Sequence, residues 1–399
     1  MHAVLKSLSK QLETKSLKEL SVHLDAKDPL AKFKSEFYLP KGLYFGGMSL
    51  GPCSKSAEHQ VMDHFKKWKR DAVKGHFGEN GFSFSDQKLK PIMSSIVGCH
   101  PDRMVMSNGL SVNLHLLLIA LYTKGDVLMC KDEFPSDQYA MQSHIKGNIV
   151  YAKDVTVTTI EKALDDNPNI SMLFMSPVQY YTGNVMDIPK IVELCKSRNV
   201  FTFLDLAHSV GNIPLKLEEW DVDCAAWCTY KYLSGGPGST AGAYVNKKHN
   251  LDKALRGWWS ESHEQRFKMS PKFHGFKTVD RLGLSNPCTI SNSSLFGSLS
   301  IYDKATLPEI FKKSKLLTGF LYTCLKKHNI KVITDIEHCG SQLSIKVGNN
   351  ASEVAKFLEN KHCIVDARHD VIRAAPGALW NSFDEVYQLS ELLNKSMNK

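Results

Sequence analysis

Two side chains near the middle of the sequence have the clearest potential for chemistry, Asp205 and Lys231. Asp205 lies at the end of the apolar run 200–206, which is typical of a strand, and a carboxylate leaving a buried strand is costly without a charged partner. Lys231 follows a short apolar run and precedes the glycine-rich loop 234–238. That position suits an amine that must reach an aldehyde in a partly dry site. Taken singly, the two residues also have ordinary interpretations, as a helix N-cap and as a lysine in a surface turn.

Taken together, the two residues indicate pyridoxal 5′-phosphate (PLP) as a cofactor. A protonated pyridine nitrogen is a suitable partner for Asp205, and a ring kept cationic takes up the electrons of a carbanion. Lys231 would hold the aldehyde as a Schiff base, and Tyr230 beside it would assist proton transfers. Ser111 opens the apolar stretch 112–121, where a helix start attracts a phosphate through its free N–H groups and its dipole. The alternative for Ser111 is plain N-capping of that helix.

The elements around these residues alternate in type, which predicts an α/β fold. Short apolar runs indicate strands, and the stretch 189–198, which begins with Pro189, indicates a helix between two of them. Such alternation is typical of a mostly parallel sheet covered by helices on both faces, with ligands beyond the carboxyl ends of its strands. The predicted strands are 127–130, 172–175, 200–206, 224–228 and 241–245.

The pattern changes near residue 292, which predicts a second domain. One long helical stretch runs to about residue 325, and short apolar runs and a helix near 353–359 follow. We therefore expect a helical N-terminal segment (1–41) packing near the small domain, a large cofactor-binding domain (42–290) and a small α+β domain (291–399).

Composition indicates a soluble protein of the cytoplasm. Of the 399 residues, 43% are hydrophobic, and no apolar run approaches the roughly 20 residues that span a bilayer. The N-terminal segment has no signal-peptide core, and the ten cysteines form no Cys-x-x-Cys pair, so we expect neither membrane insertion nor a metal site. The net charge of +9 includes a basic stretch around Trp68. We interpret that stretch as the solvated face of an amphipathic helix, with His59, Met62 and Phe65 on its apolar face, rather than as a nucleic-acid site.

At the level of motifs, the sequence resembles kynureninase, a PLP enzyme family with the aspartate-aminotransferase fold (fold type I). The most selective blocks are Asp-Leu-Ala-His at 205–208 and Tyr-Lys-Tyr-Leu at 230–233. Further similar stretches follow in family order and cover nearly the whole chain: 44–51, 111–117, 134–137, 181–183, 266–269, 284–287 and 371–383.

The resemblance implies an activity and a set of site residues. The family hydrolyses the Cβ–Cγ bond of L-kynurenine or 3-hydroxy-L-kynurenine to anthranilate or its 3-hydroxy form and L-alanine, in tryptophan catabolism and NAD biosynthesis. It implies a homodimer, since Trp258 and Asn286 match residues that reach the neighbouring subunit's cofactor. The cofactor contacts within one subunit would be Leu110, Ser111, Phe134, Asp137, Ser176, Asp205, His208, Tyr230 and Lys231. The substrate contacts would be Ser49, His76, Asn286 and Arg373, with the arginine binding the carboxylate.

The sequence departs from the family pattern at two places expected near the substrate's aryl ring. Met48 replaces an asparagine, and Asn80-Gly81-Phe82 replaces a basic-Pro-Trp run. Three other interpretations stay open: a cysteine desulfurase-like enzyme using Cys339, a PLP-binding partner protein without activity, and a nicotinamide-binding protein, for which the sequence has no Gly-x-Gly-x-x-Gly after a strand. Ser285-Asn286 resembles the form in animal enzymes that prefer the 3-hydroxylated ring.

Overall fold

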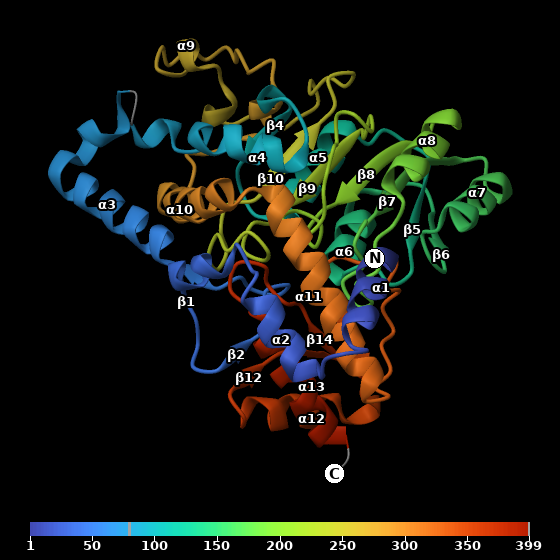
Figure 1. The fold of residues 1–399 in the computed structure, drawn as a ribbon. Helices are drawn as coiled ribbons and strands as arrows, with labels where there is room; N and C mark the ends of the chain where they lie inside the picture. The colour runs from blue at the N-terminus through green and yellow to red at the C-terminus, as the bar shows by residue number, and fades with distance from the viewer. Residues whose placement is uncertain (79–80, 398–399) are drawn as a thin grey trace.

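The computed structural model describes residues 1–78 and 81–397. Its centre is a seven-stranded sheet in the order β4-β10-β9-β8-β7-β5-β6 (Figure 1). Neighbouring strands from β9 to β6 are parallel, and β10 runs antiparallel to both of its neighbours. This confirms the predicted α/β fold with a mostly parallel sheet. The strands are β4 (Met104–Met106), β5 (Asp126–Cys130), β6 (Ile149–Ala152), β7 (Ile170–Met175), β8 (Phe201–Asp205), β9 (Cys224–Trp227) and β10 (Gly242–Val245).

Both faces of this sheet are buried, which explains why its strands are continuous apolar runs. In β5, Val127 and Met129 pack into a core on one face, and Leu128 and Cys130 pack into a core on the other. Side chains alternate across a strand, so helices must cover both faces. The helices of this part of the chain are α3 (Lys55–Asp71), α4 (Lys90–Val97), α5 (Leu110–Leu121), α6 (Pro135–His144), α7 (Val157–Asp166), α8 (Ile188–Ser197), α9 (His263–Arg266) and α10 (Thr289–Ala305).

A second, smaller core lies around the three-stranded antiparallel sheet β11-β14-β13. The N-terminal helices join this core: α1 packs on α11 and α2 on α13, although they are more than 300 residues apart in sequence (Figure 1). Asp25 of α2 accepts the backbone N–H groups of Phe383 and Asp384, and so caps the start of α13. The elements are α1 (His2–Gln11), α2 (Leu17–Asp25), α11 (Leu307–Lys327), α12 (Ala351–Glu359), α13 (Phe383–Met397), β11 (Leu343–Lys346), β13 (Asp366–Arg368) and β14 (Val371–Ala374).

Short strands link the two cores. Strand β2 (Leu43–Tyr44) pairs in parallel with β12 (Cys363–Ile364), and β1 (Phe37–Tyr38) pairs antiparallel with β3 (Cys53–Ser54). The segment between β2 and β3 runs from the small core, which contains Leu43 and Phe45, to the loop after β9, where Gly51 donates to Tyr230. The separate cores support a division near residues 41 and 290, which remains a proposal.

Two helical predictions differ from the structure in detail. The long stretch 292–325 is not one helix, since it breaks at Thr306, whose φ of 61° is left-handed, between α10 and α11. Pro308 explains the break, because it cannot donate the helical hydrogen bond of a continuous helix. Helix α3 forms as predicted, but its apolar stripe is not in the core of the single chain: Met62 and Trp68 are 49% and 55% exposed.

Candidate active site

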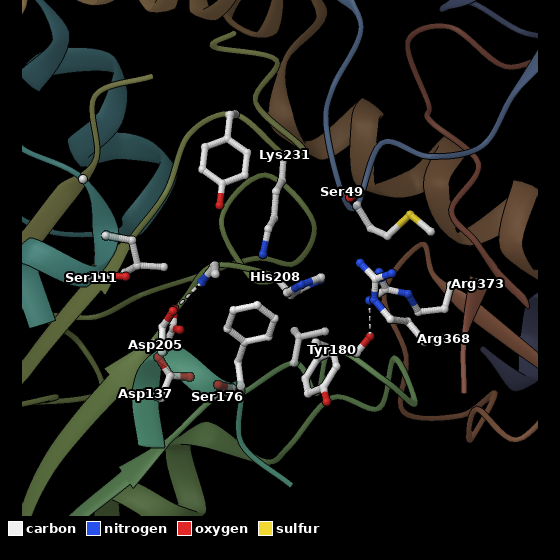
Figure 2. A pocket seen from close by; sticks show the side chains of 18 of the residues that line it. Ser49, Ser111, Asp137, Ser176, Tyr180, Asp205, His208, Lys231, Arg368 and Arg373 are labelled. Carbon is white, nitrogen blue, oxygen red and sulfur yellow. Dashed lines mark hydrogen bonds between the residues drawn. The ribbon is translucent and has the colours of Figure 1, made fainter. Parts of the chain in front are cut away.

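A cavity of about 400 Å³ lies at the carboxyl ends of the strands of the large sheet, a size suited to a small-molecule cofactor and substrate (Figure 2). The structure brings most of the predicted site residues together around it. Those that line the cavity are Ser49, Leu110, Ser111, Phe134, Asp137, Ser176, Asp205, His208, Tyr230, Lys231 and Arg373.

One end of the cavity is acidic. Asp205, the last residue of β8, and Asp137, in the first turn of α6, lie side by side (Figure 2). Asp205 accepts the Ala207 N–H at 2.8 Å, whereas neither buried Asp137 oxygen has a hydrogen-bond partner of good geometry among the described residues. Burial raises the pKa of both carboxyls, and the Lys231 charge opposes that rise. The pair offers carboxyl oxygens to a proton-bearing or cationic group of a ligand, such as a pyridinium N–H.

Lys231 extends its amine into the middle of the cavity from the loop after β9 (Figure 2). Its Nζ lies 6.0 Å from the ring centroid of Tyr230. The loop is held by the Gly51 N–H, which donates to the Tyr230 carbonyl at 2.8 Å. A Cβ at Gly51 would lie 2.4 Å from the Lys231 carbonyl oxygen, so glycine there allows the segment carrying Ser49 to approach the lysine loop.

The start of α5 forms a seat for an anion. Gly109 is the N-cap and no side chain caps this helix, so Ser111 lies inside the first turn and is not its cap. The first N–H groups of a helix have no partner within it, and the dipole adds positive potential there. The start of α5 therefore offers backbone N–H donors to a phosphate. In Figure 2, Ser111 lies across the cavity from Arg373 of the small sheet.

Two rings, those of Phe134 and His208, also line the cavity. Phe134 is 45% exposed and meets Tyr180 edge to face, with 5.4 Å between the ring centroids. His208 is buried, and its Nδ1 has no hydrogen-bond partner within the described part of the chain. Burial, with a smaller contribution from the Lys231 charge, lowers the pKa of His208 well below its ordinary value, so its imidazole is neutral. The unpartnered buried atoms of Asp137 and His208, together with the anion seat, fit PLP.

The other end of the cavity carries two arginines (Figure 2). Arg373 of β14 donates from Nε and Nη2 to Asp366 Oδ1, at 3.0 and 2.8 Å, and from Nη1 to the Tyr180 carbonyl at 2.7 Å. These bonds use three of the five N–H groups and leave one on each terminal nitrogen. The two remaining donors can bind a carboxylate. Arg368 also pairs with Asp366, at 3.2 Å.

Comparison with known proteins identifies the family. The model of the kynureninase C-terminal domain matches residues 310–393, and that of the Cys/Met metabolism PLP-dependent enzymes matches residues 87–267. A curated kynureninase from Christiangramia forsetii is 31% identical, over 97% of this chain and 99% of that protein. The kynureninase from Rattus norvegicus is 32% identical, over 94% of this chain and 92% of its own length. The chain belongs to the kynureninase family. Its cofactor is therefore PLP.

Solved structures share the fold at much lower identity. A cysteine desulfurase from Thermococcus onnurineus has a TM-score of 0.77 at 14% identity, over 90% of this chain and 95% of its own. An alanine–glyoxylate aminotransferase from Nostoc sp. has a TM-score of 0.69 at 13% identity, over 90% and 96%. These likenesses place the chain in the fold of PLP-dependent transferases and show nothing finer than that fold.

The desulfurase interpretation also lacks support in the site. Cys339 is not among the residues that line the Lys231 cavity, and its backbone forms a β-bridge with Asn184. Burial raises the pKa of its thiol to about 12, whereas a nucleophilic cysteine needs a lowered pKa. The kynureninase assignment therefore agrees with the local chemistry.

Three residues predicted from the kynureninase pattern do not line this cavity within one chain: His76, Trp258 and Asn286. His76 contacts Phe82 edge to face, and Phe82 lines a separate hollow beside α3 and α10. Of the two departures from the family pattern, Met48 does line the Lys231 cavity. Gly81 and Phe82 do not, and Asn80 lies outside the described residues.

Sequence reasoning missed Arg368, Tyr180 and Asp366. Asp366 and Arg373 are direct cross-strand partners in the antiparallel pair β13–β14, which a tight turn at His369 and Asp370 connects. Recognition of that hairpin in the sequence would have placed the acid opposite the arginine. Tyr180 offers its backbone carbonyl, for which the sequence carries no signal.

The pairing with Asp366 predicts a specific defect in substrate binding. Asp366→Ala frees the side edge of Arg373, so the guanidinium loses its fixed plane, and we expect KM for the amino-acid substrate to rise about tenfold with kcat little changed. Asp366→Asn is the matched control, since asparagine keeps an oxygen acceptor. Its KM should rise much less than that of Asp366→Ala. Steady-state kinetics of both variants measure this; an unchanged KM in Asp366→Ala would remove the orienting role.

Proposed function

We propose that this chain hydrolyses the Cβ–Cγ bond of L-kynurenine, or of its 3-hydroxy form, to anthranilate or 3-hydroxyanthranilate and L-alanine. One arrangement carries the proposal: Arg373, with two N–H groups left to donate, the Lys231 amine and the Asp137–Asp205 pair border a single cavity. An amino-acid substrate would thus be held by its carboxylate at one end while the cofactor lies at the other. Its place would be in tryptophan catabolism and NAD biosynthesis.

Each residue at the cavity has a separate role in this reaction. Arg373 binds the substrate carboxylate and so fixes the α-carbon near Lys231, whose amine removes the α-proton as a general base. When bound, PLP supplies an electron sink for the bond cleavage. Asp205 keeps a proton on the ring nitrogen. Burial raises the pKa of Tyr230, so its phenol stays protonated and can donate to a leaving group. One water is consumed for each bond cleaved.

The test is turnover by the purified protein with added PLP. Kynurenine and 3-hydroxykynurenine are supplied separately, alanine and the aryl product are quantified, and sulfide release from cysteine is measured in parallel. We expect alanine from at least one kynurenine and no catalytic sulfide. Bound cofactor with no alanine from either substrate would refute the activity while leaving the fold and cofactor in place.

We also propose a homodimer whose active sites are completed across the interface. Trp258, Phe267 and Phe77 form an exposed aromatic patch, with ring centroids 5.5 and 5.8 Å apart and about half of each side chain exposed. Exposed apolar patches of this kind favour burial against another protein. The anion seat at Ser111 is also exposed and would be covered by the partner.

Subunit mixing tests the shared site. Lys231→Ala and Asn286→Ala should each be nearly inactive alone, since one loses the amine and the other the contribution to its neighbour's site. Co-expressed, they should recover about one quarter of wild-type activity, because half of the dimers then hold one complete site. No recovery, or a monomer by sedimentation at assay concentration, would contradict the proposal.

A cytoplasmic location is proposed on chemical grounds. All ten cysteines are free thiols, and several are buried, which suits a reducing compartment. No helix within residues 1–78 and 81–397 is long and apolar enough to cross a membrane.

A further inference from the structure

A third buried carboxyl lies behind the acidic end of the cavity. Glu133 stands between β5 and α6 and is only 7% exposed. It accepts two hydrogen bonds from Ser176, the residue after β7: one from the backbone N–H at 3.0 Å and one from the hydroxyl at 2.6 Å. Ser176 itself lines the cavity, so Glu133 reaches the cofactor site through one side chain.

The groups around Glu133 are mostly acidic or neutral. Asp205 comes from β8, Asp137 from α6 and Asp132 from the same loop, and the charge of Glu133 acts in turn on Tyr180 and Cys130. No ion pair to Glu133 occurs among the residues that the structure describes. Burial first, and then the charges of Asp205 and Asp132, raise the pKa of Glu133 to about 7 despite the bonds from Ser176.

The protonation of Glu133 decides the direction of the bond to the Ser176 hydroxyl. An ionised Glu133 has no proton to give, so the hydroxyl must donate to it and turns only a lone pair towards the cavity. A protonated Glu133 can donate to the same hydroxyl, which then frees the Ser176 proton to face the cavity. The backbone N–H of Ser176 donates to Glu133 in both states, so the loop stays in place.

We propose that Glu133 is a positioning residue that, through the hydroxyl of Ser176, couples the binding of PLP to pH. Below neutrality Ser176 acts as a donor to an oxygen of the cofactor, and above neutrality this donor is withdrawn and one more negative charge lies near an anionic ligand. The coupling rests on PLP as the cofactor and not on which substrate is cleaved. A residue with only a structural role at position 133 could be glutamine. Its neutral amide would accept the same Ser176 N–H, and burying it would cost less free energy than burying a carboxylate.

The test measures the dissociation constant of PLP between pH 6 and 8. We expect the constant of the wild type to rise about tenfold more across this range than that of Glu133→Gln, because the glutamine amide donates to Ser176 at every pH and mimics the protonated acid. Ser176→Ala should bind PLP more weakly than the wild type at pH 6 and about equally at pH 8, so that it keeps only the smaller pH dependence due to the charge of Glu133. Glu161→Gln, which changes an exposed acid of α7 outside the cavity lining, should keep the wild-type dependence.

The outcomes separate the possible roles. A Glu133→Gln protein that keeps the full pH dependence, or one that loses affinity equally at every pH, would overturn the coupling and leave a structural role. Thermal unfolding of the cofactor-free variants verifies that each is folded, and Ser176→Ala provides the second route if Glu133→Gln is unstable. Because this test measures PLP binding, a protein that fails to hydrolyse kynurenine would not alter its result. Equally, a pH-independent PLP affinity would not argue against kynurenine hydrolysis.

Discussion

Lys231→Ala is expected to lower turnover by at least about 10³-fold and to abolish covalent attachment of PLP, because it removes both the amine that holds the aldehyde and the general base. Among residues 1–78 and 81–397, no other lysine lines the cavity, so no amine there would replace it. Borohydride reduction followed by peptide mass analysis should locate the pyridoxyl group on the peptide containing Lys231 in the wild type and nowhere in the variant.

The exposed lysine at 247 provides a matched control, since Lys247→Ala removes the same charge from the same domain far from the cavity lining. It should retain wild-type turnover and attachment. Trapped cofactor on another lysine, or a Lys231→Ala protein with near-normal turnover, would show that the amine acts elsewhere.

Asp205→Asn is expected to lower kcat on the order of 10²-fold, because the amide cannot hold a positive charge on the ring nitrogen and the electron sink weakens. The substitution is isosteric and can keep the bond from the Ala207 N–H at 2.8 Å. PLP should therefore still bind. Visible absorbance of the bound cofactor verifies occupancy, and wild-type kcat in a fully loaded variant would contradict the role of Asp205.

The same variant should be more stable than the wild type when both are free of cofactor. Burial raises the folded-state pKa of Asp205, so ionisation costs folding energy that is absent below the unfolded pKa near 4 and grows as pH rises towards the folded pKa. Asparagine has no such cost. The gain in Tm should therefore be larger at pH 7 than at pH 4; an equal gain at both pH values would exclude this electrostatic origin.

The sequence is sufficient to predict five of the seven strands of the large sheet, all except β4 and β6, and to place Asp205 and Lys231 at or after the ends of two of those strands. Strands buried on both faces are continuous apolar runs, so β5, β7 and β8 are found at nearly their observed bounds. Asp205 is recognisable because it is a charge at the end of such a run. Lys231 is recognisable because glycines follow it. Both residues are thus recognised from their neighbours along the chain.

Features that depend on contacts across the fold could not be predicted. Glu133 gains its role only because the loops after β5 and β7 meet at one edge of the sheet, and a lone glutamate in a loop gives no sign of burial. The exposed stripe of α3 has the same periodicity as a buried one, since a hydrophobic pattern does not specify what covers it.

The groups that border the cavity come from two sheets: Asp205 ends β8 of the seven-stranded sheet, Lys231 lies on the loop after β9 of the same sheet, and Arg373 belongs to β14 of the three-stranded one. In the proposed function, a bound amino acid would therefore bridge two separately packed cores, and its length would have to match the gap between them. A β-amino acid, which places one more methylene between amine and carboxylate, would fit only if those cores moved apart. We therefore expect discrimination against such compounds by backbone length, independent of the ring they carry.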